Sequence, residues 1–429
     1  MSAENPSISW LGSAGHRSWL MTQADSLFRF YERASIDPRG GFYELTTNGR
    51  PSLETTRHLV WTARLVYCFS LADMLGRPGA SVIVRHGLES LERQFKDKEY
   101  GGHFWITDAT GPVDTSKQAY GIAHVILAGA AATRAGYDDG RLLLAKGLAE
   151  LDAHFWREDD GLVVEEFQRD WVGPSRYRGA NSNMHLVEAL LNATAATGEL
   201  SHSLRALKIA DGIIRVRTQA NEWRIAEHYT DDWLIDRAYN SHDPDNIFRP
   251  FGSIIGHWFE WSRLLLQAGA LIGDDASWTS VAAENLFRMA VEEGWDNVHG
   301  GLIYTVDFEG RPLNRDRYWW PIAEGICAAA YLAEATNDRQ YERWYRTFWD
   351  FAATHLIDHA RGGWQHVLDP QNDPKFSPYA GKVDIFHALH ACLLPLLPKD
   401  QIPITALAAG AIDIPGCART APLQTQWQR

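Results

Sequence analysis

"EYGGHFWITDATGP" (residues 99–112) is one copy of a short unit that recurs along the chain. Aromatic and β-branched residues alternate with polar ones, and turn-forming residues stand at its ends, a pattern that predicts a short β-hairpin. Copies recur at intervals of about sixty residues, with one interval about twice as long. The copies that contain glycine are 37–51, 99–112, 159–167, 297–312 and 360–369. We assign the glycine-free segment 221–233 to the long interval, which gives six repeats.

Two different helical segments separate successive hairpins. The one before a hairpin is amphipathic, as in "RLLLAKGLAELDAHFW" (141–156), where one stripe is apolar. The one after a hairpin is apolar on nearly every face, as in "PIAEGICAAAYLAEA" (321–335), which is typical of a buried helix. Six alternations predict an all-α fold, an (α/α)6 barrel of six inner and six outer helices with short β-hairpins at one rim. We therefore expect one catalytic domain over residues 1–400 and an irregular tail over 401–429, although 429 residues alone would suggest two or three domains.

Composition and charge exclude several classes of protein. The net charge of −13, without a basic block, disfavours nucleic acid as a partner. We find no apolar run of about 18 residues and no signal peptide, so we expect no membrane association. Four scattered cysteines fit a reduced, cytoplasmic protein, and 18 tryptophans lean weakly toward a carbohydrate site.

Polar residues gather in or just before the first turns of the inner helices. Parallel inner helices would bring these turns together at one rim, where they would surround a pocket. They are Arg57, His58, Lys117, Gln118, Asn181, His185, Glu188, Arg249, His257, Glu260, Trp319, Trp320, Glu324, Asp384, His387 and His390.

Three histidines stand out among them. His185, His257 and His387 are read as sharing a position in the repeat, which favours a common function over three unrelated core histidines. We interpret His124, His154 and His390 as buried core residues.

Their neighbours suggest supporting roles, each with a plainer alternative. A glutamate follows two of these histidines by three residues, on the same helix face, where it could orient an imidazole or accept a sugar hydroxyl. It could also simply meet the helix dipole. Arg57, at the start of a buried helix, is expected to contact the ligand rather than only balance charge. Trp319 and Trp320 fit either a sugar platform or the core.

Motifs for other chemistries are missing from the sequence. We find no nucleophile elbow, phosphate-binding loop or HExxH zinc motif. The three histidines are far apart in sequence, and two have a carboxylate one turn on, so we predict neither a metal ion nor a cofactor.

Several segments resemble the N-acylglucosamine 2-epimerase superfamily, which contains cellobiose 2-epimerases, mannose isomerases and sulfoquinovose isomerases. The resemblance covers roughly residues 15–398 and rests on "TTRHLVWTARLVY" (55–67), "RGANSNMHLVEA" (178–189), "RPFGSIIGHWFEWSRLLL" (249–266), "WWPIAEGI" (319–326) and "GKVDIFHALHACLLP" (381–395). "RGANSNMH" and "GKVDIFHA" look most like the mannose and sulfoquinovose isomerases, whereas Val383 departs from the more polar residue expected near the sugar.

The resemblance implies the same barrel and metal-free acid–base chemistry by histidine on a free sugar. It places the catalytic histidines at His185, His257 and His387, the sugar-binding arginine at Arg57, and a glutamate beside the second histidine at Glu260. We predict an aldose–ketose isomerase that interconverts D-mannose and D-fructose, and D-lyxose and D-xylulose as a second pair, through a cis-enediolate.

In this hypothesis His387 moves the proton between C2 and C1. His257, steered by Glu260, is the acid–base partner at the ring oxygen or O1, and the roles of these two histidines could be exchanged. His185 and Arg57 hold the hydroxyls. The other residues expected to bind substrate are Asn181, Arg249, Trp320, Glu324 and Gln118.

Rival functions remain open from the sequence alone. A sulfoquinovose isomerase would need an extra cation, for which Arg249 is the candidate, and a sugar 2-epimerase would use the same intermediate. A glycoside hydrolase, which needs two carboxylates across a glycosidic bond, and a non-catalytic sugar-binding protein fit less well. The expected partner is a monosaccharide, and the sequence leaves the oligomeric state undetermined.

Overall fold

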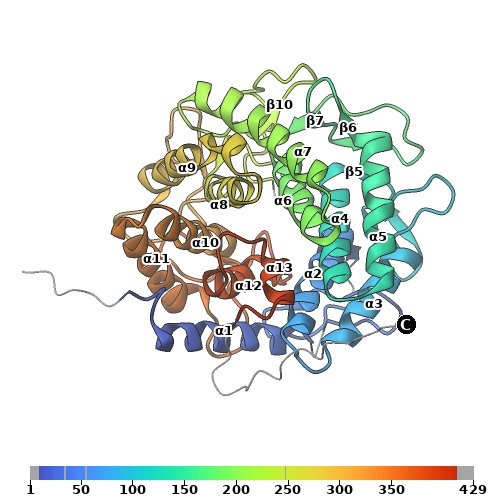
Figure 1. Ribbon diagram of the computed structural model, residues 1–429, viewed down its shortest axis with the longest axis horizontal. Helices are drawn as coiled ribbons and strands as arrows, with labels where there is room; N and C mark the ends of the chain where they lie inside the picture. Colours follow the sequence, from blue (N-terminus) through green and yellow to red (C-terminus); the bar gives the residue numbers. More distant parts are fainter. Residues whose placement is uncertain (1–8, 33–34, 54–55, 247, 413–429) are drawn as a thin grey trace, which may run out of the picture.

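Two concentric rings of helices form the molecule (Figure 1), seen here in a computed structural model that describes residues 9–32, 35–53, 56–246 and 248–412. The inner ring contains α2 (Leu59–Met74), α4 (Ala119–Arg134), α6 (Ala180–Thr197), α8 (Ile255–Ile272), α10 (Trp319–Thr336) and α12 (Phe386–Leu393). The outer ring contains α1 (Ala14–Glu32), α3 (Ala80–Arg93), α5 (Asp138–Glu150), α7 (Leu200–Ala210), α9 (Trp278–Gly294) and α11 (Arg339–Phe351). The predicted (α/α)6 barrel is confirmed.

Hydrophobic pattern explains which helix lies in which ring. All residues of α10 from Trp319 to Leu332 are buried, because neighbours cover every face of an inner helix. In the outer helix α3 the buried residues Ile83, Val84, Leu88 and Leu91 follow a helical spacing and face inward. Short π-helical or 3₁₀ segments extend or connect helices at 151–155, 211–218, 219–221, 274–276, 352–356 and 394–396.

Short antiparallel strands tie the six repeats into a closed circle. In each pair, the strand just before an inner helix pairs with the hairpin of the next unit. The six pairs are β2 (Arg57–His58) with β3 (Ile106–Thr107), β5 (Lys117–Gln118) with β8 (Glu166–Phe167), β9 (Arg178–Gly179) with β10 (His228–Tyr229), β11 (Ser253–Ile254) with β12 (Thr305–Val306), β13 (Arg317–Tyr318) with β14 (Val367–Leu368), and β15 (Gly381–Lys382) with β1 (Leu45–Thr46). The last pair joins the final unit to the first, so the circle closes.

The predicted hairpins are present, but they are only part of this strand pattern. Local pairing joins β3 to β4 (Pro112–Asp114) and β6 (Trp156–Arg157) to β7 (Leu162–Val163). The glycine-free sixth copy is also real, since it supplies β10 and a bridge between Tyr229 and Ile235.

Ion pairs with little exposure to solvent hold four of the six hairpins to the strand that follows them. Each links an aspartate in a hairpin to a cation in the strand before the following inner helix. The pairs are Asp37 with Arg57, Asp97 with Lys117 at 3.0 Å, Asp296 with Arg317 at 2.5 Å, and Asp358 with Lys382 at 2.7 Å. Arg57 is therefore one member of a repeated structural device.

We expected the segment after residue 400 to be irregular, but part of it is helical. A short helix, α13 (Pro403–Ala408), buries Ile404 and Leu407 and packs against α2, α4 and α6. Residues 413–429 of the expected tail lie outside the described residues. Within the described ranges, every helix is too short or too polar to cross a membrane.

Candidate functional site

A cavity opens at the rim where the inner helices begin, and all six inner helices contribute to its wall. It holds about 650 Å³ of empty space, its open mouth included. The lining residues are His58, Val60, Trp61, Arg64, Tyr120, Asn181, His185, Phe248, Ile254, His257, Glu260, Tyr304, Trp319, Trp320, Tyr379, Asp384 and His387.

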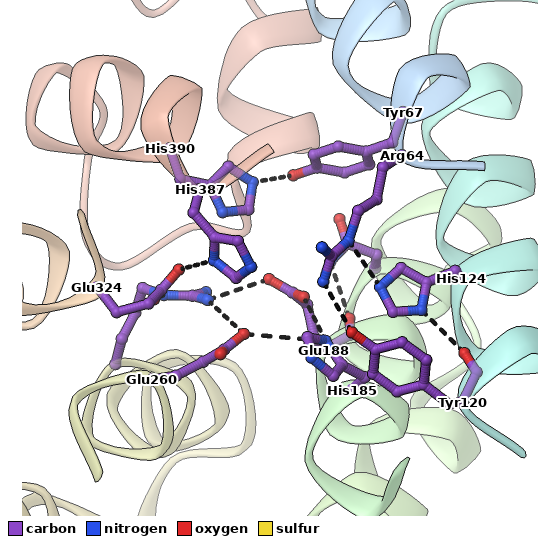
Figure 2. Close-up of polar contacts among 12 residues, drawn as sticks. Arg64, Tyr67, Tyr120, His124, His185, Glu188, Glu260, Glu324, His387 and His390 are labelled. Atoms are coloured by element: carbon purple, nitrogen blue, oxygen red, sulfur yellow. Dashed lines mark hydrogen bonds and ion pairs between the residues drawn. The ribbon is translucent and has the colours of Figure 1, made fainter. Parts of the chain in front are cut away.

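The floor of the cavity is a polar layer built by one repeat position. Five successive inner helices place a polar side chain at their sixth residue: Arg64, His124, His185, Glu260 and Glu324. Because these helices start at the same rim, equal positions lie at equal depth. Neighbouring members touch: Arg64 Nε donates to His124 Nε2 at 3.0 Å, the rings of His124 and His185 are 4.8 Å apart, and His185 Nδ1 lies 3.8 Å from Glu260 Oε1. Figure 2 shows this layer around the barrel axis.

Two histidines at the cavity have a carboxylate behind them. His257 Nδ1 donates to Glu227 Oε2 at 2.9 Å, and His387 Nδ1 donates to Glu324 Oε1 at 2.8 Å. These bonds fix the tautomer, so the Nε2 atom of each imidazole is left for a ligand. The Trp320 ring lies between them, 5.2 Å from the ring of His257 and 5.7 Å from that of His387.

Local packing explains how Trp320 reaches this place. Gly256 occupies the second position of α8, as Trp320 does in α10. A Cβ atom at Gly256 would overlap the indole ring, so the glycine leaves room for it.

Burial keeps His387 neutral. It lowers the pKa of His387 to about 3, with a further contribution from the nearby Arg64 guanidinium. A neutral imidazole with its Nδ1–H already donated has a lone pair at Nε2, as a general base requires. Glu324, which also accepts from Arg263 Nε at 3.0 Å, would stabilise the imidazolium once it forms.

The surroundings of Glu260 favour its protonated form, so this side chain can act as an acid. Burial raises the pKa of Glu260 well above its usual value, and the neighbouring carboxylates of Glu324 and Glu188 raise it further. Both Glu260 oxygens are buried without a hydrogen-bond partner among the described residues. Arg263 lies nearby, 3.6 Å from Glu260 Oε1 and 3.2 Å from Glu188 Oε1. A protonated Glu260 could therefore donate to an oxygen atom of a ligand.

Arg64 is the arginine that lines the cavity. Its Nη1 lies 2.6 Å from Asp384 Oδ2, and its Nη2 donates to the Tyr120 hydroxyl at 3.1 Å. With its Nε held by His124, all three guanidinium nitrogens have a fixed partner, and the side chain still lines the cavity.

The structure brings together six of the ten residues predicted for the site. Those that line the cavity are Asn181, His185, His257, Glu260, Trp320 and His387. Glu324 lies behind His387, as described above. Arg57, Gln118 and Arg249 are not among the lining residues.

The surroundings of these three explain why. Arg57 pairs with Asp37 and lies over the Tyr43 ring, 4.6 Å from its centroid. Arg249 bonds Glu166 at 3.2 Å and Gln118 at 3.5 Å. We therefore expect Arg64, and not Arg57, to contact the sugar.

Two further details of the sequence-based interpretation were wrong. His185, His257 and His387 do not share a repeat position, since His185 is the sixth residue of α6, whereas His257 is the third of α8. Glu260 does not orient His257, because Glu227, from the hairpin before α8, holds its Nδ1. Glu260 lies instead beside His185.

The expected core histidines are partly confirmed. His390 is buried and bonds the Tyr67 hydroxyl at 3.1 Å. His124 is buried as well, but it orients Arg64. His154, partly buried, stacks on Trp171 at a centroid distance of 3.7 Å.

Comparison with known proteins gives this geometry a family. The sequence profile of the N-acylglucosamine 2-epimerase (GlcNAc 2-epimerase) family matches residues 40–391. The chain belongs to the N-acylglucosamine 2-epimerase family. A member of that family from Thermobifida fusca, named D-mannose isomerase, is 42% identical over 403 residues, which span 93% of this chain and 98% of that protein.

Solved structures with a similar fold agree with this assignment. A crystal structure of D-mannose isomerase superposes with a TM-score of 0.84 at 32% identity and covers 92% of this chain and 99% of its own. The cellobiose 2-epimerase of Spirochaeta thermophila has a TM-score of 0.77 at 23% identity, covering 92% and 97%, and shows the shared fold.

In this member of the N-acylglucosamine 2-epimerase family, sequence reasoning missed several site residues. Arg64 and Tyr120 lie inside helices that look uniformly apolar, yet a count from each helix start would have aligned Arg64 with His185 and Glu260. Glu227 could have been found through its counterpart Glu165, since both are buried hairpin carboxylates and contact the third residue of the next inner helix. Tyr304 and Tyr379 carried no comparable signal.

Two groups of side chains could in principle hold a metal ion. They are His185, Glu188 and Glu260, and Glu260, Glu324 and His387, whose ligand atoms lie within 4.8 Å of one another in each group. The Arg263 guanidinium already lies 3.2 Å from Glu188 and 3.0 Å from Glu324. A divalent cation would be repelled by this resident charge, so the residues present fit a metal poorly.

Proposed function

We propose that this protein is an aldose–ketose isomerase that interconverts D-mannose and D-fructose without a metal ion. The observation that carries the proposal is the pair His257 and His387, each fixed by a carboxylate and each with Nε2 left for a sugar. Relatives named D-mannose isomerase, at 36 to 42% identity over most of the chain, support the choice of substrate.

The reaction moves one hydrogen from C2 to C1. After the ring opens, His387 Nε2 accepts the proton from C2, and the C2–H electron pair forms the C1–C2 double bond of a cis-enediolate. His257 Nε2 accepts the proton from O2 and passes it to O1. His387 then returns its proton to C1, which gives the ketose. Burial suits His387 to this role, since it lowers the pKa of the imidazole and leaves it neutral at neutral pH.

The remaining polar groups would hold and polarise the sugar. Arg64 and a protonated Glu260 are suited to the developing negative charge on the enediolate oxygens, because both are buried donors fixed before the substrate arrives. Asn181 and His185 would bind hydroxyls. The Trp320 ring offers an apolar face to the C–H groups of the sugar.

A sulfonated substrate is less well supported. Arg249, the cation that sequence reasoning reserved for a sulfonate, is paired with Glu166 and does not line the cavity. A 2-epimerase would use the same enediolate, so it stays an outcome of the test. The cytoplasmic location stays a prediction.

The decisive assay is incubation of the purified protein with D-mannose, sulfoquinovose and cellobiose in separate reactions. We expect fructose from mannose, at a rate that is unchanged after treatment with EDTA. Glucose as the main product would instead identify an epimerase. Loss of activity with EDTA and its return with one divalent ion would disprove the metal-free mechanism.

Exchange of the C2 hydrogen in heavy water separates the roles of the two histidines. His387→Ala should abolish both exchange and product, because nothing removes the C2 proton. His257→Gln should lose on the order of 10²-fold in turnover yet retain slow exchange, because His387 can still remove the C2 proton. Near-normal turnover by either folded variant would contradict the mechanism.

A further inference from the structure

We infer that His58 binds the C6 hydroxyl of the sugar and so makes this site prefer a hexose to the corresponding pentose. The inference rests on the proposed function, which sets where the reacting carbons lie. D-Mannose and D-lyxose differ only in the CH2OH group at C5, so a contact to C6 acts on one of these sugars and not on the other.

The surroundings of His58 point to a missing polar partner. Its side chain lines the cavity at the start of α2 and is only 7% exposed. Its Nδ1 is buried without a hydrogen-bond partner among the described residues. Its ring neighbours are Trp61 at 4.4 Å, Trp105 at 4.6 Å and Phe248 at 5.8 Å between centroids. A buried polar atom among aromatic rings normally has a partner. The His58 side chain lines the cavity, so a ligand there would meet its imidazole.

The chemistry of the imidazole fits a hydroxyl group. Burial lowers the pKa of His58 to about 4, so the ring is neutral near pH 7. A neutral imidazole has one donor and one acceptor nitrogen, and a sugar hydroxyl can serve either. Among the described residues that line the cavity, Arg64 is the one arginine or lysine, and it lies deeper along α2 than His58.

The order of the inner helices places His58 away from the reacting carbons. α2 touches α4 and α12, and three steps around the ring lead from α2 to α8, so His257 is on the opposite wall (Figure 1). C1 and C2 must lie near the two acid–base histidines, on the side formed by α8, α10 and α12. The other end of the sugar then extends toward α2.

Depth along α2 separates two sets of sugar contacts. Arg64 lies six residues after His58, about 9 Å deeper at the rise of a helix. Arg64 therefore suits hydroxyls near the reacting centre, whereas His58 suits the end nearest the mouth. Phe248, from the segment before α8, reaches across the mouth to His58 and Trp105 and encloses that end.

The test measures kcat/KM for D-mannose, 6-deoxy-D-mannose and D-lyxose. It uses the wild-type protein and the variants His58→Phe and His58→Gln. In His58→Phe, which keeps a ring among the aromatic neighbours, we expect kcat/KM for mannose to fall about fivefold to tenfold relative to lyxose. Because 6-deoxy-D-mannose has no hydroxyl group at C6, the variant should change its kcat/KM as it changes that of lyxose. His58→Gln keeps a donor and an acceptor and should restore part of the preference. An equal loss for all three sugars would overturn the inference.

His103→Phe is the matched control. His103, from the next hairpin, is also a buried histidine whose ring nitrogens make no hydrogen bond among the described residues, but it does not line the cavity. This variant should leave the ratio of mannose to lyxose unchanged. Circular dichroism melting of each variant checks folding.

Binding of reduced sugars keeps the inference separate from the proposed function. Mannitol and arabinitol cannot be isomerised and differ by the same CH2OH group. Titration calorimetry should show that His58→Phe weakens mannitol more than arabinitol, and equal weakening would count against the role of His58. If wild-type protein shows this preference but does not convert mannose, the proposed function fails while the contact to C6 stands.

Discussion

At the scale of single residues, Arg57 and Arg64 show how close positions can differ in role. Both are buried at the start of α2, and both pair with an aspartate. Asp37, the partner of Arg57, belongs to the hairpin before β2, whereas Asp384, the partner of Arg64, lines the cavity. We therefore expect one arginine to govern stability and the other to govern catalysis.

Replacement of Arg57 tests its expected role in stability. Arg57→Met would remove the buried partner of Asp37 and leave it with the more exposed Arg39 alone, so the free energy of unfolding should fall by about 1.5–3 kcal/mol, as urea denaturation would measure. KM of the folded enzyme should be unchanged. Arg57→Lys should cost less, since Lys117 and Lys382 occupy equivalent positions. A raised KM in folded Arg57→Lys would return Arg57 to the sugar site.

Replacement of Arg64 tests its expected role in catalysis. Arg64→Lys keeps the charge but cannot bond Asp384, His124 and Tyr120 at once, so kcat/KM should fall by about tenfold or more. Steady-state kinetics together with a melting curve would check this. An unchanged kcat/KM would show that Arg64 does not contact the sugar.

At this scale the sequence predicted the types of residue in the site better than it predicted which side chains contact each other. Histidines with carboxylates were expected from residue types alone. The pairing of His257 with Glu227 and of His387 with Glu324 was not, because each carboxylate comes from a different element. Spacing within one helix cannot reveal such contacts between elements.

At the scale of elements, helices were predictable because their signal is local. Hydrophobic periodicity within one segment distinguishes an inner from an outer helix. Strand pairing is not local, since each joint connects residues from different repeats, such as Leu45 with Lys382. The helix α13 was missed because its six residues are too few to show a period.

The joint between β15 and β1 makes a prediction about closure of the circle. Gly381 pairs with Thr46, and a Cβ atom there would collide with the backbone carbonyl of Leu45, which cannot rotate away. Gly381→Ala should lower the melting temperature, with a loss of about 1–3 kcal/mol.

Gly15 of α1 is the control for this change, because a Cβ atom there meets nothing closer than 3.7 Å. Gly15→Ala should be neutral or slightly stabilising in the same calorimetric scan. Equal melting temperatures for both variants would mean that the closing joint contributes little.

At the scale of the whole molecule, the repeat count correctly predicted the (α/α)6 barrel. The same architecture buries many histidines, because the starts of inner helices are both the site and part of the core. Burial lowers the pKa of His58 to about 4 and lowers the pKa of His103, His366, His387 and His390 to about 3. Burial also lowers the pKa values of His124 and His185 well below the usual range.

These shifts make stability depend on pH in a definite direction. In the unfolded chain each histidine binds a proton near pH 6.5, whereas the folded chain keeps it neutral down to about pH 4 or lower. The unfolded state therefore binds more protons in this window, so stability is lost as pH falls below 6.5, by up to about 1.4 kcal/mol per pH unit for each group. Glu150 acts in the opposite sense, since burial raises its pKa to about 7, and Glu44, Glu165 and Glu260 are raised too. The strongly shifted histidines outnumber these glutamates, so the net effect is a loss.

The rate of catalysis by His387 should not follow the pH dependence of stability, so the two effects can be measured separately. A base whose pKa lies near 3 stays unprotonated at pH 5, so C2 hydrogen exchange by the folded enzyme should be nearly as fast at pH 5 as at pH 7. The urea midpoint should meanwhile drop clearly over the same range. Initial exchange rates over short times, measured beside urea titrations at each pH, would distinguish the two effects. If exchange instead fell tenfold per pH unit below 6.5 while the urea midpoint stayed constant, His387 would titrate like an exposed histidine, and burial could not be what keeps the base neutral.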